Sequence, residues 1–366
     1  MRIVSVVGTR PQFVKAAPVS RLLRQRHDEV LVHTGQHYDD AMSAAFFRDL
    51  DLPPPDRDLG VGSGTHANQT AEMLRRLEPL LSEEAPDAVL VYGDTNSTLA
   101  GALAAAKLVD GAGKRPWLAH VEAGLRSFNP AMPEERNRIV ADHLSDLLLA
   151  PTPAAMANLA REGLAELATM VGDVMVDAFM AASFRADDFL PPIAKGRPYL
   201  LLTLHRPSNV DDPVRLGAWL EAVAEQAAPA LFPVHPRTRA VLDSAHVAIP
   251  ESVTLLEPVG YLAMVALERA ARVIATDSGG VQKEAYLAGV PCVTLRAETE
   301  WTETLQTGWN RLCPEPGDAP AAITAADEVD RAGPRPPLFG DGHAAERIVE
   351  ALERLTAGRA TALVAS

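Results

Sequence analysis

Residues 1–11 read MRIVSVVGTRP, and this stretch decides the fold. The run Ile3–Val7 predicts a strand that is buried on both faces, as strands of parallel sheets are. A glycine follows the strand directly, and a helical pattern begins after Pro11. The same order returns at residues 199–207, YLLLTLHRP, where an apolar run again leads to an arginine and a proline. The repetition predicts two domains of the same kind, in agreement with a length of 366 residues.

Short β-branched runs alternate with helical patterns along the whole chain, which is typical of parallel sheets covered by helices. The strands predicted in the first half are Ile3–Val7, Val30–Thr34, Ala88–Tyr92, Trp117–Val121, Leu147–Ala150 and Thr169–Val171. Those of the second half are Tyr199–Leu204, Ala230–Val234, Val253–Leu255, Val273–Thr276 and Cys292–Leu295. The predicted fold class is α/β, with two Rossmann-like doubly wound domains facing each other across a cleft.

Irregular sequence between Asp173 and Pro198 predicts the hinge between the domains. We therefore expect a first domain at residues 1–172, joined by the tail 352–366, and a second domain at 173–351. The Pro-, Ala-, Gly- and Asp-rich stretch Pro314–Pro337 is expected to run over the surface, ahead of a last helix at Ala344–Leu355.

The charge and the cysteine content exclude several classes of protein. Lysine and arginine number 34 against 48 aspartates and glutamates, a formal net charge of −14, which disfavours nucleic acid as a partner. The first apolar run is too short for a signal peptide, and no window is long enough for a membrane span, so we expect a cytoplasmic protein without a membrane partner. Cys292 and Cys313 lie in apolar sequence and are expected in the core.

The loop after the first strand is a candidate anion site. Gly8 allows close approach of the backbone to a ligand, and Arg10 and Lys15 offer cations to a phosphate. The alternative is a plain strand-to-helix turn with surface charges.

Three carboxylates are candidates for acid and base chemistry. Asp94 follows a buried strand, where the alternative role is a helix N-cap, and Glu122 ends another strand, in HVEAGLR at 120–126, where Arg126 adds a cation. A helix that begins at Pro133 explains Glu135 as a first-turn acid facing the helix dipole, and leaves Glu134 as the third candidate.

The second half contributes a histidine and a glycine-rich turn. His205 follows the strand Tyr199–Leu204, although a lone histidine is usually structural, and His235 is a weaker candidate. Thr276–Glu284 reads TDSGGVQKE, a strand end, a turn and a helix start. Its N–H groups suit a pyrophosphate, and its last residue suits the two hydroxyls of a ribose. The turn lacks the glycine patterns typical of NAD and ATP sites.

Taken together, these motifs resemble the non-hydrolysing UDP-N-acetylglucosamine 2-epimerase family. The resemblance runs from Gly8 to about Arg311 and rests on GTRP at 8–11, TGQH at 34–37, GDT at 93–95, HVEAGLR at 120–126, PEERNR at 133–138, HR at 205–206 and TDSGG at 276–280. It implies the two-domain GT-B fold and a homodimer. It also implies interconversion of UDP-GlcNAc and UDP-ManNAc, by anti elimination of UDP and re-addition to 2-acetamidoglucal, with no metal and no redox cofactor.

Functional residues carry over from the family position by position. The catalytic set implied by the resemblance is Asp94, Glu122, Glu134 and His205. The UDP-sugar-binding set is Arg10, Lys15, Arg126, Ser278, Gly279, Gly280 and Glu284.

Departures from the family pattern leave other substrates and outcomes open. Residues 36–39 read QHYD where many bacterial members have QHRE in an allosteric site, and Trp301 stands where the best-known members have arginine. The sequence TEW at 299–301, together with GTRPQ at 8–12, also resembles relatives that act on UDP-2,3-diacetamido-glucuronate. A hydrolysing epimerase that releases ManNAc and UDP is a further alternative. A GT-B glycosyltransferase and a non-catalytic nucleotide-sugar sensor fit the sequence less well, because no acceptor-docking patch is evident and because all three carboxylates and the histidine are present.

Overall fold

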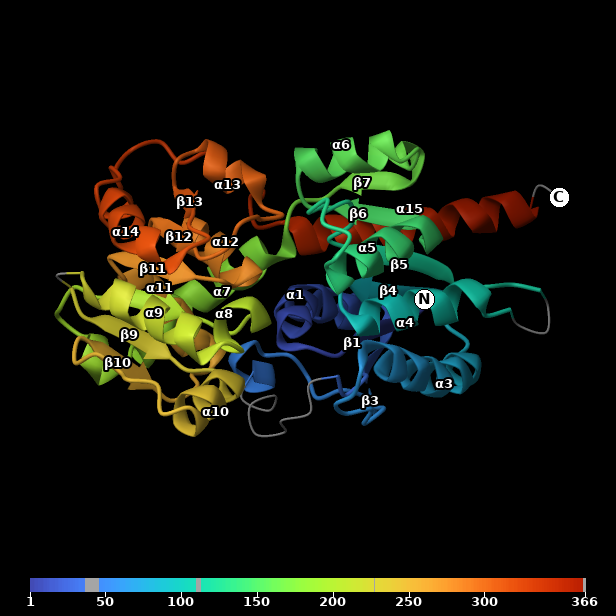
Figure 1. Ribbon diagram of the computed structural model, residues 1–366. Helices are drawn as coiled ribbons and strands as arrows, with labels where there is room; N and C mark the ends of the chain where they lie inside the picture. The colour runs from blue at the N-terminus through green and yellow to red at the C-terminus, as the bar shows by residue number, and fades with distance from the viewer. Residues whose placement is uncertain (37–45, 110–112, 227, 365–366) are drawn as a thin grey trace. The chain divides into compact units, whose positions relative to one another are not determined.

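A computed structural model of the chain describes residues 1–36, 46–109, 113–226 and 228–364. The chain forms two compact units: Met1–Met180 together with Phe339–Ser366, and Ala181–Leu338. Each unit is built around a parallel sheet whose strands alternate with helices along the chain (Figure 1). The predicted α/β class with two doubly wound domains is confirmed.

The described part of the first unit holds a seven-stranded parallel sheet in the order β3-β2-β1-β4-β5-β6-β7. The chain builds outward from β1 in one direction and then returns to add β4 on the other side. This topological switch point is where doubly wound proteins bind their ligands. The strands are β1 (Arg2–Val7), β2 (Asp28–His33), β3 (Arg57–Asp58), β4 (Ala88–Tyr92), β5 (Trp117–Val121), β6 (Leu147–Ala150) and β7 (Ala168–Met170).

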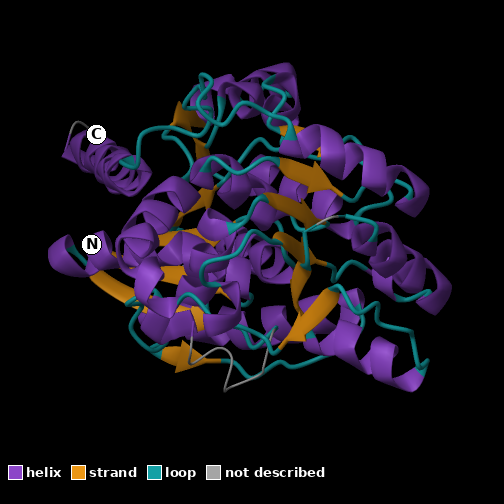
Figure 2. Cartoon of the chain, turned by 90° about the vertical axis from the view of Figure 1, so that its left-hand side faces the viewer, coloured by secondary structure: helices purple, strands orange, loops and turns teal. Residues whose placement is uncertain are grey.

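Helices cover the sheets of both units, as Figure 2 shows. The central strands of the first unit are almost wholly buried and mostly apolar, because a strand with helices on both faces has no side in water. The helices of this unit are α1 (Arg10–Arg26), α3 (His66–Glu84), α4 (Asn96–Lys107), α5 (Pro133–Leu144), α6 (Pro153–Arg161), α7 (Val174–Ala186, which runs into the second unit) and α15 (Ala344–Val364).

The second unit repeats this plan with a six-stranded parallel sheet, again counted over the described residues, in the order β10-β9-β8-β11-β12-β13. Its switch point lies between β8 and β11. The strands are β8 (Leu200–Thr203), β9 (Ala230–Pro233), β10 (Val253–Leu256), β11 (Val273–Thr276), β12 (Cys292–Thr294) and β13 (Asn310–Leu312). The helices are α8 (Pro207–Val210), α9 (Pro213–Ala224), α10 (Pro236–Ser244), α11 (Tyr261–Ala270), α12 (Gly279–Ala288), α13 (Thr302–Gln306) and α14 (Ala319–Asp327).

Two segments differ from the sequence prediction. The expected irregular hinge begins with the helix α7, whose apolar side chains are largely buried. The stretch expected to run over the surface contains α14, because Ala319, Ile323 and Ala326 recur at helical spacing and enter the core of the second unit. Both cysteines are buried, as expected.

The compact units also have other bounds than those expected from sequence. The first unit extends to Met180 rather than residue 172, and the returning segment begins at Phe339 rather than residue 352. Hydrogen bonds explain the longer return, since Asp177 accepts the N–H groups of Ala344 and Ala345 at 3.2 and 2.9 Å. These bonds anchor the start of α15 to α7. The motif QHYD at 36–39 differs from the family pattern, and its residues 37–39 lie outside the described residues.

Candidate active site

The carboxyl ends of β1 and β4 meet at the switch point of the first unit. Gln12 joins them, because its side chain accepts the Gly8 N–H at 2.8 Å and donates to the Tyr92 carbonyl at 2.7 Å. A Cβ on Gly8 would lie 2.1 Å from the hydroxyl oxygens of Thr34 and Ser97. No other residue therefore fits at position 8, as expected where backbone must come close to its surroundings.

Glu122 lies at the end of β5 with its backbone in the left-handed region, at φ +71°. Residues other than glycine rarely adopt this backbone conformation, and those that do are found most often at functional sites. The Glu122 N–H is held by the Leu149 carbonyl at 3.1 Å, and the buried carboxylate pairs directly with the Lys15 ammonium. Gly93 faces this ion pair, since its Cβ would lie 3.0 Å from the Lys15 nitrogen. Lys15, expected to contact phosphate, is thus placed against a catalytic candidate.

Asp94 follows Gly93, and two side chains of the helix α5 bind it. Its carboxylate pairs with Arg138, and its carbonyl accepts the Asn137 side-chain amide at 3.0 Å. Arg138 is buried and pairs also with Glu135 at 2.7 Å. The first turns of α5 therefore fix the position of the Asp94 side chain.

The two neighbouring glutamates at the start of α5 have different surroundings. Glu135 is buried and accepts the backbone N–H groups of Ser127 and Phe128, both at 2.9 Å. This contact ties the loop before α5 to the helix, a structural role. Glu134 is half-buried, and its carboxylate has no hydrogen bond or ion pair within the described part of the chain. Its carboxylate is the one of the two that remains available to a ligand.

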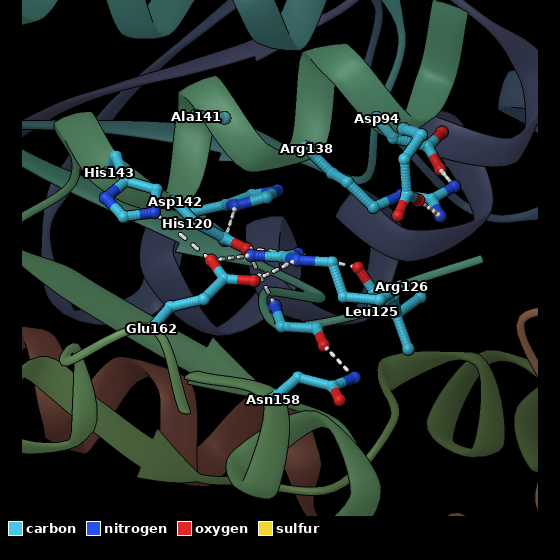
Figure 3. Close-up of polar contacts among 12 residues, drawn as sticks. Asp94, His120, Leu125, Arg126, Arg138, Ala141, Asp142, His143, Asn158 and Glu162 are labelled. Carbon is cyan, nitrogen blue, oxygen red and sulfur yellow. Dashed lines mark hydrogen bonds and ion pairs between the residues drawn. The ribbon is translucent and has the colours of Figure 1, made fainter. Parts of the chain in front are cut away.

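Arg126 lies in a closed network of polar groups (Figure 3). Its guanidinium forms two hydrogen bonds of 2.7 Å to Glu162, one of 2.6 Å to the Leu125 carbonyl and an ion pair of 2.8 Å with Asp142. A guanidinium has five N–H donors, and these four contacts occupy most of them. The geometry gives Arg126 a structural role, and the predicted contact with substrate gains no support from it.

Arg10 lies at the first position of α1, half-buried, with its guanidinium 5.6 Å from the centre of the Phe46 ring. This contact is within the range of cation–π attraction. The side chain starts the helix at the switch point, as the sequence predicts, and its role toward a nucleotide stays a prediction.

In the second unit, His205 and Asp277 form a dyad across the switch point. Their side chains lie 3.0 Å apart, and Asp277 also accepts the backbone N–H groups of His205 at 3.1 Å and of Arg206 at 3.0 Å. Burial favours the neutral acid, but the charge and hydrogen bond of His205 and the bonds from Arg206 and Asn209 outweigh it and lower the pKa of Asp277. The aspartate orients the imidazole through Nδ1.

The glycine-rich turn caps α12. The Ser278 hydroxyl accepts the Val281 N–H at 3.4 Å, and a Cβ on Gly279 would lie 2.6 Å from a carboxylate oxygen of Glu300. Gly280 is the second residue of the helix, so the three predicted anion-binding residues lie together at its N-terminus. The positive end of the helix dipole and these N–H groups form a site for an anion.

Glu284 lies one turn further along α12 and is buried. It neighbours Glu268 of α11, and burial together with the charge of Glu284 raises the pKa of Glu268 well above the usual range of a carboxyl group.

Three residues of the site had no role assigned from the sequence: Arg138, Asp142 and Asp277. Each is buried and ion-paired with a group 22 or more positions away, at Asp94, His120 and His205 respectively. The only sequence signal was their position inside the quoted or adjoining motifs. Within the described ranges, no cluster of His, Cys, Asp and Glu is arranged to hold a metal ion. None of the described helices has both the length and the apolar character that a membrane crossing needs.

Comparisons with known proteins identify the family of the chain. A family model described as UDP-N-acetylglucosamine 2-epimerase matches residues 21–353. A UDP-N-acetylglucosamine 2-epimerase homolog of Methanococcus maripaludis is 45% identical, over 97% of this chain and 100% of the relative. The UDP-2,3-diacetamido-2,3-dideoxy-D-glucuronate 2-epimerase of Pseudomonas aeruginosa is 44% identical over the same shares.

Solved structures show the same likeness. The UDP-GlcNAc 2-epimerase of Methanocaldococcus jannaschii, solved in complex with UDP-GlcNAc and UDP, has a TM-score of 0.88 and 40% identity, over 97% of this chain and 100% of that one. The calicheamicin glycosyltransferase CalG4 has a TM-score of 0.58 at 17% identity, over 98% of both chains, and shares the fold alone. The predicted resemblance and the GT-B fold class are thereby confirmed.

Proposed function

Because the chain belongs to the UDP-N-acetylglucosamine 2-epimerase family, we propose that it interconverts UDP-GlcNAc and UDP-ManNAc by eliminating and re-adding UDP. It is an isomerase of UDP-sugars. UDP-GlcNAc is the preferred substrate because several relatives at 40–45% identity carry that activity in their names.

The reaction that we propose has two balanced halves. A carboxylate removes the C2 proton, the C2–H electrons form the C1–C2 double bond, and UDP leaves C1 with the electrons of the C1–O bond. UDP then re-adds to C1 while a proton is delivered to the opposite face of C2. The C2 proton has no adjacent carbonyl to acidify it, so the reaction depends on placed carboxylates and on stabilisation of the departing UDP.

We assign the proton transfers to Asp94, Glu122 and Glu134. Glu122 is supported by its contact with Lys15, whose ammonium favours the ionised carboxylate that a base must be. Asp94 is supported by its contact with Arg138, and Glu134 by its carboxylate being the one at the start of α5 that is not used in structure.

We assign the binding of the departing UDP mainly to residues of the second unit. His205, oriented by Asp277, donates to the diphosphate, and the turn Ser278–Gly280 supplies N–H groups at the N-terminus of α12. The buried Glu284 is assigned to the ribose hydroxyls. Arg10 is assigned a cationic contact with UDP in the first unit.

A single observation carries the proposal. Glu122 is a buried carboxylate on a left-handed backbone, in contact with a buried lysine, directly beside the switch point. Holding a glutamate in this backbone conformation lowers the stability of the fold by about 1–3 kcal/mol. Proteins retain such strained residues where function requires them.

The test is proton NMR of UDP-GlcNAc with the enzyme in deuterated buffer. We expect the anomeric signals of UDP-ManNAc to appear, with deuterium at C2 of both sugars. Glu122→Gln is the inactive control, and it should retain UDP binding by calorimetry. Release of free ManNAc and UDP would contradict the non-hydrolysing reaction, and an unchanged spectrum would contradict UDP-GlcNAc as the substrate.

A second candidate substrate is UDP-2,3-diacetamido-glucuronate. It is favoured by the relative from Pseudomonas aeruginosa and by Trp301, which is buried with the Lys283 ammonium 3.8 Å from its ring centre. The same NMR measurement with this sugar, compared by kcat/KM with UDP-GlcNAc, decides between the two substrates.

A further inference from the structure

His120 lies on β5, two residues before Glu122, and is completely buried. Both of its ring nitrogens have partners at short distance. Nδ1 lies 2.7 Å from the Asp142 carboxylate, and Nε2 lies 2.6 Å from the Gly93 carbonyl oxygen. Figure 3 shows the ring between α5 and the strands.

Both partners are acceptors, and this determines the state of the ring. A carbonyl oxygen and an ionised carboxylate have no proton to donate, and a neutral imidazole donates from only one nitrogen. Only the imidazolium, with a proton on each nitrogen, satisfies both contacts. Burial raises the pKa of Asp142, but the hydrogen bonds and charges of His120 and Arg126 outweigh it and lower that pKa, so the facing carboxylate is ionised.

The pair connects the loops of two candidate catalytic carboxylates. The Gly93 carbonyl belongs to the peptide group that leads into Asp94, so the His120 ring fixes the orientation of that peptide. The other carboxylate oxygen of Asp142 accepts the Gly124 N–H at 3.1 Å, in the turn that follows Glu122. Arg126 completes the charge balance at 2.8 Å from Asp142, and Glu162 lies beyond it.

We propose that His120 is a positioning residue, a buried imidazolium paired with Asp142, that fixes the Gly93–Asp94 peptide and with it the Asp94 carboxylate. The assignment of Asp94 rests on the proposed epimerase function. The ring itself touches no substrate, because none of its surface is exposed.

Two substitutions separate positioning from packing. The amide nitrogen of glutamine matches the place of Nε2, and that of asparagine matches the place of Nδ1. His120→Gln therefore keeps the donor to Gly93, while His120→Asn keeps the donor to Asp142 and loses the bond to Gly93. We expect His120→Asn to lower kcat roughly 100-fold and His120→Gln to recover at least about tenfold of that loss. KM should stay within about twofold in both variants.

The matched control is His143→Gln, on the same helix as Asp142, where an exposed histidine lies 3.1 Å from Glu162 at the outer end of the network. It should leave kcat unchanged. Equal kcat for the two His120 variants, or a higher value for asparagine, would overturn the positioning role.

Nitrogen-15 NMR of the wild-type protein, labelled at the histidine ring nitrogens, tests the charge state of His120 even if the variants do not fold. We expect both nitrogens of the His120 ring to show the chemical shift of a protonated nitrogen. In Asp142→Asn, the amide oxygen is needed by Gly124 and Arg126, so its NH₂ group should face Nδ1 and convert the ring to the neutral Nε2–H form. A neutral ring in the wild type would overturn the proposal. Failure to epimerise UDP-GlcNAc would contradict the proposed function alone, since the NMR result does not depend on the substrate.

Discussion

Glu122 and Gly93 are two left-handed residues that face each other across the first-unit site. Glu122 has φ +71° and Gly93 has φ +62°, but only the second is a glycine. A Cβ on Gly93 would lie 3.0 Å from the Lys15 nitrogen and 3.3 Å from the Glu122 carboxylate. The absence of a side chain at position 93 thus leaves room for the ion pair.

Gly93→Ala should therefore damage both stability and activity. The left-handed backbone alone costs about 1 kcal/mol for an alanine, and displacement of the Lys15–Glu122 pair adds to this cost. We expect an unfolding free energy lowered by about 1–3 kcal/mol and a kcat lowered roughly 100-fold. Urea unfolding and steady-state kinetics measure the two effects.

The control for this substitution is Gly163→Ala. Gly163 has φ +78° and no heavy atom within 4 Å of the added Cβ, so only the backbone cost applies. Its kcat should equal that of the wild type. Equal losses of kcat in the two variants would show that strain, and not the position of the ion pair, explains the result.

Residue types at this site could be predicted from sequence, but their contacts could not. Glu122 was evident because a carboxylate at the end of an apolar strand needs a reason to be there. The partner of Asp94 is Arg138, 44 positions away, and the partners of Arg126 within the chain are Asp142 of α5 and Glu162. Pairings of this kind depend on how the helix lies against the sheet, which no local pattern encodes.

At the scale of elements, Asp277 connects the two strands at the switch point of the second unit. It follows β11, and it accepts N–H groups from the loop after β8 and from the side chain of Asn209 on α8. A buried carboxylate with several donors is stabilised in its ionised form, so its folded pKa lies below its unfolded one.

The sign of the pH dependence follows from this shift. Between the folded and the unfolded pKa, the unfolded chain binds more protons, so the free energy of unfolding rises with pH. Asp277 thus contributes stability above the ordinary aspartate pKa of about 3.9, and this contribution is lost as the pH falls toward the folded pKa. We expect Asp277→Asn to lower the unfolding free energy at pH 7 by roughly 1–3 kcal/mol. Below pH 4 the difference from the wild type should shrink.

Urea unfolding at pH 7 and at several acidic values measures this difference. Asp243→Asn, an exposed change on α10, is the control, and its unfolding free energy should match that of the wild type at each pH. A deficit of Asp277→Asn that stays constant down to pH 3 would show that shape, and not ionisation, underlies the stability.

Elements with a single dominant signal were predictable, and short or covered ones were not. The buried strand β4 appears as an uninterrupted apolar run, and β5 as an apolar run broken only by His120, and both have the bounds predicted from sequence. The edge strands β3 and β13 have two and three residues and few apolar side chains, so their pairing is set by the neighbouring strand. The helix α14 was hidden in Pro- and Ala-rich sequence, although its buried residues have helical spacing.

At the scale of the whole molecule, the chain completes the first unit only after building the second. The helix α15 follows the second unit in sequence, yet it belongs to the first and contacts α1, β5 and β6 (Figure 1). Ile348, Val349 and Leu352 of this helix are fully buried. The apolar core built around Trp219 draws its residues from the second unit alone.

We therefore expect Ile348→Ala to destabilise the first unit selectively. Loss of a buried isoleucine costs about 2–5 kcal/mol, and here the cost should fall on β5 and β6, although these strands lie some 200 positions earlier in the chain. Hydrogen exchange in mild urea, followed by mass spectrometry, should show faster exchange in peptides of Met1–Met180 and unchanged exchange in Ala181–Leu338. Ile323→Ala, in the core of the second unit, should give the reverse pattern. Equal acceleration of both units by either substitution would mean that they unfold as one cooperative body, and that α15 stabilises the whole chain rather than the unit it completes.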